Sequence, residues 1–157
     1  HGQVTWVIEQ GAVGGVPLLE FKFGCSANAE AYVASPHQFA YFQAAGFDAA
    51  QLGAPQENVD IASRKVITDA GYGPGYKTPG LPHRTGHGIG LDMHEWGNAV
   101  IGNKRPLEPG MCFSIEPTVA IPGKFGVRLE DCCYMTENGP AWFSNPSVAI
   151  DDPFGNN

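Results

Sequence analysis

The stretch Leu81-Pro-His-Arg-Thr-Gly-His-Gly-Ile-Gly-Leu-Asp-Met-His-Glu95 is the most informative part of the chain. It contains three of the five histidines, His83, His87 and His94. Glycines stand on both sides of His87, and glycine lets a ligand or another backbone segment approach where a side chain would collide. We therefore expect the chemistry of the chain to be found here.

The spacing of His83 and His87 does not indicate the helical zinc motif, in which two histidines four residues apart accompany a glutamate. Pro82 and the alternating glycines oppose a helix, and the only glutamate of the stretch follows His94. We predict instead an extended strand over 86–90, followed by a bend. Strict strand alternation would put His87 and His94 on opposite faces, so a bulge or turn must separate them if both serve one pocket.

Two later segments carry glutamates inside apolar strands. Residues 111–117 alternate so that Glu116 lies on the more polar face, and residues 127–134 alternate so that Glu130 shares a face with Arg128. Neighbouring antiparallel strands could present the two glutamates side by side, where they repel unless a cation or a proton lies between them. Pairing with Arg128 or simple solvation is the alternative, but a third ligand from His87 favours a metal site.

Together these segments resemble the M24 metallopeptidase family. The resemblance rests on residues 83–95, on Pro-Gly-Met at 109–111 leading to Ile-Glu-Pro at 115–117, and on Gly-Val-Arg-Leu-Glu-Asp at 126–131. It covers the chain from about Phe47 onward and is closest to the Xaa-Pro aminopeptidase and prolidase branch. It implies an α+β pita-bread fold of the creatinase and aminopeptidase kind, with a curved antiparallel sheet flanked by helices. We expect one catalytic domain over 1–157 that lacks part of its N-terminal half.

The resemblance also implies a site and a reaction. Family positions match six residues here, the metal ligands His87, Glu116 and Glu130 and the catalytic histidines His94, His37 and His83. Nitrogen and oxygen donors without thiolate suit Mn²⁺ or Co²⁺ best, with Zn²⁺ or Fe²⁺ as alternatives. Metal-activated water would attack the peptide bond before proline, in a peptide substrate with proline at its second position. In this scheme His94 and His37 steady the substrate, while His83 lies near the proline ring or orients His87.

One part of the family pattern is missing from this chain. The dinuclear site of the family also uses two aspartates, on a hairpin between a Pro-His loop and the next helix. No aspartate lies between His37 and Asp48. Two alternatives therefore stay open: a catalytically impaired pita-bread module that binds peptides or proteins, and a metal-free hydrolase of the creatinase kind with a histidine base.

Composition excludes other classes of function. The 157-residue chain has a formal charge of −7, a pI near 5.0 and only 9 lysines and arginines, which argues against nucleic-acid binding. No apolar run is long enough to span a membrane. Four cysteines without Cys-x-x-Cys spacing indicate reduced thiols, hence a cytoplasmic enzyme. We expect no signal peptide within this sequence, and we expect the natural amino terminus upstream of His1; a homodimer is left open.

Periodicity and turn residues predict the remaining elements. We expect strands at 4–8 and 16–23, joined by a glycine-rich turn at Gly11, Gly14 and Gly15, and then a loop or strand edge at 28–38 that carries His37. One helix is expected at 39–52 and a second from an N-cap at Asn58 to about Ala70. Loops are expected at 71–80 and 96–109.

Overall fold

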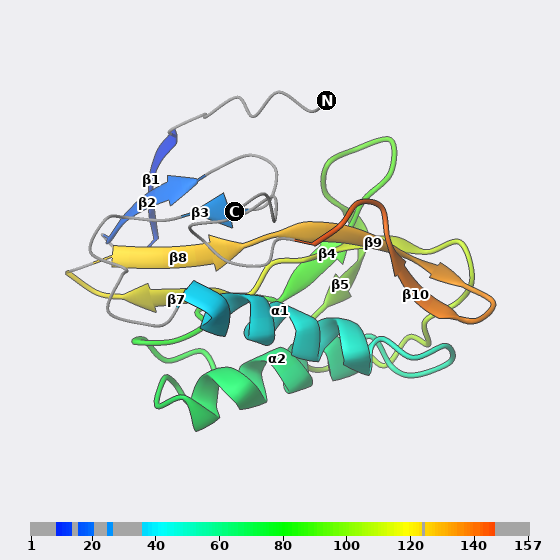
Figure 1. Ribbon diagram of the computed structural model, residues 1–157, viewed down its shortest axis with the longest axis horizontal. Helices are drawn as coiled ribbons and strands as arrows, with labels where there is room; N and C mark the ends of the chain where they lie inside the picture. The colour runs from blue at the N-terminus through cyan, green and yellow to red at the C-terminus, as the bar shows by residue number, and fades with distance from the viewer. Residues whose placement is uncertain (1–8, 14–15, 21–24, 27–35, 124, 147–157) are drawn as a thin grey trace.

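A computed structural model describes residues 9–13, 16–20, 25–26, 36–123 and 125–146 (Figure 1). Within these residues the chain forms two helices and ten strands. The elements are β1 (Glu9–Val13), β2 (Val16–Glu20), β3 (Cys25–Ser26), α1 (Pro36–Ala49), α2 (Glu57–Asp69), β4 (Gly86–Gly88), β5 (Glu95–Ala99), β6 (Cys112–Ile115), β7 (Thr118–Ile121), β8 (Phe125–Leu129), β9 (Asp131–Thr136) and β10 (Gly139–Trp142).

The strands form three antiparallel sheets, and the chain passes directly between the two larger ones. One sheet has the order β10-β9-β6-β4-β5, another has the order β3-β8-β7, and β1 pairs with β2 alone. The chain crosses between the two larger sheets twice, once from β6 to β7 and once from β8 to β9. Ile115 faces Asp131 before the crossing and Thr118 faces Arg128 after it, so one register continues through the break. That register brings Glu116 opposite Glu130.

Both helices lie side by side against one face of the sheets, with α1 nearer to β7 and β8 in the view of Figure 1. In β6, β7, β8 and β9 the odd-numbered residues point into this helix-side core, as alternation requires, whereas in β4 the odd-numbered His87 points to the opposite face. Two buried clusters result. One contains Phe42, Ile67, Leu81, Val119, Val127 and Leu129, and the other contains Ala50, Val59, Ala99, Leu107, Phe113, Ile115, Cys133 and Met135. Even-numbered polar residues are left for the opposite face.

The predicted helices are present, but their boundaries are shifted. The first helix begins at Pro36, so His37 lies in its first turn and not in the loop predicted over 28–38. Proline is well tolerated there because the first turn leaves its N–H groups unbonded. The second helix begins at Glu57 after Gln56, and the prediction of Asn58 as N-cap was wrong.

The strands depart from prediction in four places. The first strand runs over Glu9–Val13 and includes Gly11, which was expected in a turn, while residues 4–8 lie outside the described part. Strand β5 occupies the start of the loop expected at 96–109. Strand β7 was not anticipated. The strand expected over 127–134 is interrupted at Glu130, where the chain changes sheets. None of the described helices has the length and apolarity needed to span a membrane.

Candidate metal centre

Strand β4 supplies His87 and lies between β5 and β6 in the five-stranded sheet. A Cβ atom at Gly86 would lie 1.9 Å from the carbonyl oxygen of Ser114, and one at Gly88 would lie 2.0 Å from that of Trp96. No side chain fits at either position, so the two neighbouring strands approach as closely as they do only because glycine stands there. The glycines therefore set the depth at which His87 sits, with 3% of its surface exposed.

The imidazole of His87 is oriented by its own strand. Its Nδ1 lies 2.9 Å from the carbonyl oxygen of Gly88, which can only accept, so Nδ1 carries the proton and Nε2 presents a lone pair. The backbone N–H of His87 donates to the hydroxyl of Ser114 at 3.1 Å. Burial lowers the pKa of His87, which keeps the ring neutral at physiological pH. A neutral ring with a free Nε2 is the form that binds a metal ion.

Glu116 and Glu130 lie where the chain passes from one sheet to the other, and both reach toward His87. Ligand atoms of the three side chains lie within 4.8 Å of one another, and no other described residues form such a group of three. The Nε2 of His87 is 3.3 Å from Oε1 of Glu116. Two ligands about 2.1 Å from one ion are about 3.0–3.4 Å apart at octahedral to tetrahedral angles. The observed separation therefore fits a shared cation.

Electrostatics around Glu116 point the same way. Burial, followed by the charge of Glu130, raises the pKa of Glu116 to about 8, although the charge of Arg84 and a hydrogen bond from Ser114 oppose the shift. Arg128 donates to Oε2 of Glu116 at 2.6 Å and also favours the charged form. Two facing carboxylates with one guanidinium still leave negative charge in a buried place. A divalent cation between them would relieve that repulsion.

The histidine at position 94 lies beside His87 because the chain turns back between β4 and β5. Residues 90–94 form a bend, which is the turn that the sequence required between the two histidines, and the pairing of β4 with β5 also shifts register between Gly86 and Gly88. As a result the two rings lie with centroids 4.2 Å apart at an angle of 44°. His94 is exposed, so its ring is accessible to a substrate bound next to His87.

His83 was expected either near the proline ring of the substrate or as an orienting partner of His87, and its ring contacts favour neither role directly. Its Nδ1 donates to the carbonyl of Arg84 at 2.5 Å, and its Nε2 lies 2.9 Å from the hydroxyl of Thr118. Burial lowers its pKa. Both ring nitrogens are engaged, and it is Gly88 that orients His87.

The other predicted residue, His37, belongs to the first turn of α1, and its side chain lies outside the described part. Because α1 begins at Pro36, there is no hairpin between His37 and the helix, which agrees with the missing aspartates. Asp48 is exposed on α1 and is not one of the three clustered residues. Asp60 is buried and bonded elsewhere.

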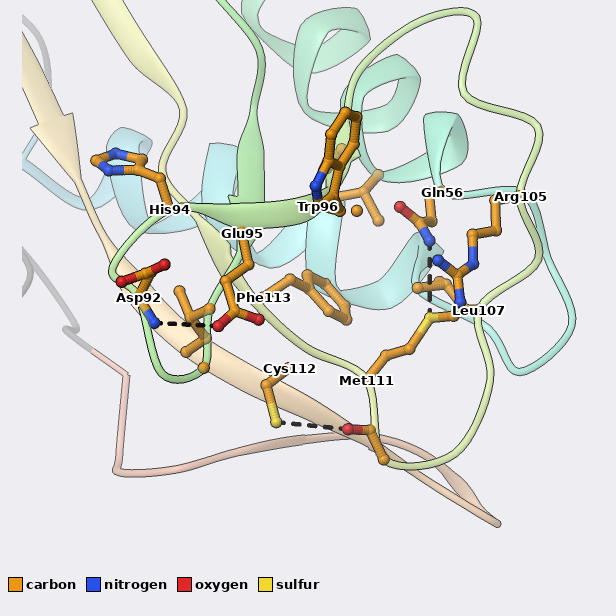
Figure 2. Close-up of a pocket in the computed structure, with 16 residues that line it drawn as sticks. Gln56, Asp92, His94, Glu95, Trp96, Arg105, Leu107, Met111, Cys112 and Phe113 are labelled. Carbon is orange, nitrogen blue, oxygen red and sulfur yellow. Dashed lines mark hydrogen bonds between the residues drawn. The ribbon is translucent and has the colours of Figure 1, made fainter.

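A cavity of about 670 Å³ opens next to this centre. Figure 2 shows His94 at one end of it and Gln56 and Arg105 at the other, with Trp96 above. None of the three clustered ligands lines it; His94 is the one predicted site residue that does. Glu95 fixes the adjoining loop, since its carboxylate accepts the backbone N–H of Asp92 at 3.0 Å. The cavity is thus a neighbour of the metal centre and not its interior.

Sequence reasoning missed the buried ion pair of Asp60 and Arg64, whose closest atoms are 2.9 Å apart. Opposite charges four residues apart on a predicted helix were visible in the sequence. Such pairs are usually solvated, however, and only the fold shows that this one faces the segment before His87.

Comparisons with known proteins agree with this geometry. Residues 40–137 match the metallopeptidase family M24. An Xaa-Pro dipeptidase of Lactobacillus delbrueckii subsp. lactis is 48% identical over 108 residues, which are 69% of this chain and 28% of that protein.

Solved structures give the same result. The dipeptidase PepE of Mycobacterium ulcerans superposes with a TM-score of 0.65 at 34% identity, over 85% of this chain and 38% of that one. The prolidase of Pyrococcus furiosus superposes with a TM-score of 0.65 at 27% identity, over 80% of this chain and 39% of that one. These likenesses confirm the α+β pita-bread fold. The chain spans less than a third of the length of the curated relative cited above, but more than half of it matches one family, and the chain belongs to metallopeptidase family M24.

Proposed function

We propose that this chain carries the metal centre of a peptidase that cleaves the bond before a proline. The observation that supports the proposal most directly is the convergence of His87, Glu116 and Glu130 within 4.8 Å. The substrate class comes from the names of the relatives, an Xaa-Pro dipeptidase and a prolidase. Mn²⁺ or Co²⁺ suits this donor set best, with Zn²⁺ or Fe²⁺ as alternatives.

Each residue has a distinct part in the proposed centre. His87 presents Nε2, and Glu116 and Glu130 each present a carboxylate oxygen. A divalent ion held there would lower the pKa of bound water and polarise the scissile carbonyl. Arg128 holds the second oxygen of Glu116 and keeps that carboxylate turned toward His87.

The histidines around the ligands suit the handling of a peptide. His94 is exposed beside His87 and can donate a hydrogen bond to an oxygen that gains negative charge during attack. His83 is kept neutral by burial, and its Nε2 lies 2.9 Å from the hydroxyl of Thr118, two residues after Glu116. His37 is proposed from the resemblance alone.

A second candidate, an impaired module that binds peptides without cleaving them, is favoured by the lack of any aspartate from residue 38 to residue 47. Three ligands hold one cation, whereas the clamping of both attacking and leaving oxygens uses two. The cytoplasmic location and a homodimer stay predictions.

Metal titration and peptide hydrolysis separate these candidates. The purified chain, dialysed free of metal, is titrated with Mn²⁺ in a calorimeter and then assayed with the dipeptide Ala-Pro and the tripeptide Ala-Pro-Gly. Binding with hydrolysis that Glu116→Gln abolishes supports the peptidase, and binding without hydrolysis supports the impaired module. Hydrolysis that persists in excess chelator supports the metal-free mechanism, and no binding at all rejects the metal centre.

A further inference from the structure

Asp60 is a helix residue whose carboxylate reaches the sheet layer. It has no exposed surface, and it accepts hydrogen bonds from the hydroxyl of Thr85 at 2.5 Å, from the backbone N–H of Ile101 at 3.1 Å and from two nitrogens of Arg64 at 2.9 and 3.3 Å. A buried carboxylate is stable only when such donors satisfy it, so their positions are tightly constrained.

Its partner Arg64 extends the constraint along the segment that precedes β4. The guanidinium donates to the carbonyl oxygens of Gly75 and Leu81 at 2.7 Å each and to that of His83 at 2.8 Å. Asp60 and Arg64 together therefore fix both the segment that enters β4 and, through Ile101, the segment that leaves β5.

Thr85 links this ion pair to two of the proposed ligands. Its carbonyl oxygen accepts the backbone N–H of Glu116 at 2.7 Å, and it stands two residues before His87 on the same extended segment. Its side chain is fully buried and points to Asp60. Thr85 thus accepts a backbone hydrogen bond from Glu116, precedes His87 by two residues, and is held to α2 by its side-chain hydrogen bond to Asp60.

We propose that Thr85, held by Asp60, is a positioning residue that fixes the spacing between His87 and Glu116. This inference rests on the proposed function, because the spacing between His87 and Glu116 matters only if the two residues bind one metal ion. Ligands must be held within about 0.5 Å of the productive geometry, and a backbone free to slide by that amount does not meet this requirement. Loss of a partner outside the ligand shell typically weakens metal binding by about 10–100-fold.

A first experiment needs no metal. Thr85→Val removes the hydroxyl at nearly constant volume, and Thr85→Ser retains it. Ser63→Ala is the control, because it removes a buried hydrogen bond from the hydroxyl of Ser63 in α2 to the carbonyl oxygen of Phe42 in α1, a bond that does not involve β4. Amide hydrogen exchange is followed by NMR at Glu116 and at Met135, whose N–H bonds to Met111 far from Thr85.

Positioning predicts that Thr85→Val lowers the protection of Glu116 at least tenfold more than that of Met135, that Thr85→Ser restores it, and that Ser63→Ala lowers both equally. An equal loss at Glu116 and Met135 in Thr85→Val would show a purely structural role and overturn the proposal. If Thr85→Val fails to fold, the same comparison is made between Thr85→Ser and Thr85→Ala, and equal losses again reject it.

A second experiment titrates Mn²⁺ into the same variants. Thr85→Val should weaken binding about 10–100-fold, whereas Ser63→Ala and Thr85→Ser should leave it within about threefold of the original chain. Unchanged affinity in Thr85→Val overturns the proposal. Absence of binding in the unmodified chain rejects the metal function instead, and the exchange experiment then decides the positioning role by itself.

Discussion

Arg128 donates a 2.6 Å hydrogen bond to one carboxylate oxygen of Glu116 while the other oxygen lies 3.3 Å from Nε2 of His87. The two oxygens of a single side chain thus have different tasks, one held by a cation of the protein and the other turned toward the proposed metal position. This division also explains how a carboxylate with only 4% of its surface exposed can be accommodated next to Glu130.

Mn²⁺ should stabilise the chain, and the stabilisation should depend on Glu116. At a free Mn²⁺ concentration 100 times the dissociation constant, the gain in unfolding free energy is about 2.7 kcal/mol, or about 5–10 °C in melting temperature for a chain of this size. Glu116→Gln should lose the shift, whereas Glu108→Gln, an exposed position on the loop before β6, should keep it. Differential scanning calorimetry with and without Mn²⁺ measures both, and an equal shift in the two variants would contradict the assignment.

Without metal, Glu116 should contribute a loss of stability as pH rises from about 5 to about 8. The pKa of Glu116 is raised from 4.5 to about 8, so the folded chain keeps a proton that the unfolded chain has already released in this window. Unfolding free energies from urea titrations should therefore fall with pH more steeply in the original chain than in Glu116→Gln. The lowered pKa of His83 is common to both proteins and cancels in the difference, whereas His87, whose Nε2 lies 3.3 Å from Glu116, is part of the difference that is measured. Parallel pH profiles would refute the shift.

Gly86→Ala should be far more damaging than Gly71→Ala. Gly71 has a positive φ of 94° and open space around it, so alanine there costs about 1 kcal/mol of backbone strain. At Gly86 the new Cβ would meet the carbonyl oxygen of Ser114 at 1.9 Å, and the neighbouring strand of the sheet would have to move. We expect a loss of about 3 kcal/mol or more, or failure to fold. Urea unfolding of the two variants tests this, and similar losses would count against the close strand contact.

Arg64→Leu should cost about 3–5 kcal/mol of unfolding free energy, because it leaves the carboxylate of Asp60 buried without its cation. Lys65→Leu, one residue further along the helix, removes an exposed pair with Asp69 and should leave stability nearly unchanged. Thermal unfolding of both variants provides the comparison. If the two substitutions cost the same, Asp60 is not held as the structure indicates.

The three clustered residues were predicted from short motifs together with the resemblance to family M24 that those motifs carry. Glycines around His87 indicated close backbone approach, and strand alternation placed Glu116 and Glu130 on polar faces. The parity of their positions predicted a bulge or turn between His87 and His94, and the bend at 90–94 confirms it.

Other features depend on contacts that no local pattern contains. The sheet change at Glu130 is set by strand pairing between distant segments, β8 with β3 and β7 and β9 with β6. The role of Asp60 could be recognised only once the fold placed it next to Thr85, which is 25 residues away along the chain. An acidic residue in a helix is usually solvated, so its burial could be recognised only from the fold.

One pairing register runs without a break from the β6–β9 pair to the β7–β8 pair, and it limits where residues can be inserted or deleted in this chain. A single residue gained or lost between Cys112 and Glu116 would reverse inward and outward positions downstream, and Glu116 would then compete with apolar neighbours for the helix layer. The turn that follows Ile121 can absorb insertions without this effect, because it lies beyond the pairing of the acidic residues. In a set of relatives, gaps should therefore collect at that turn and be rare on either side of it.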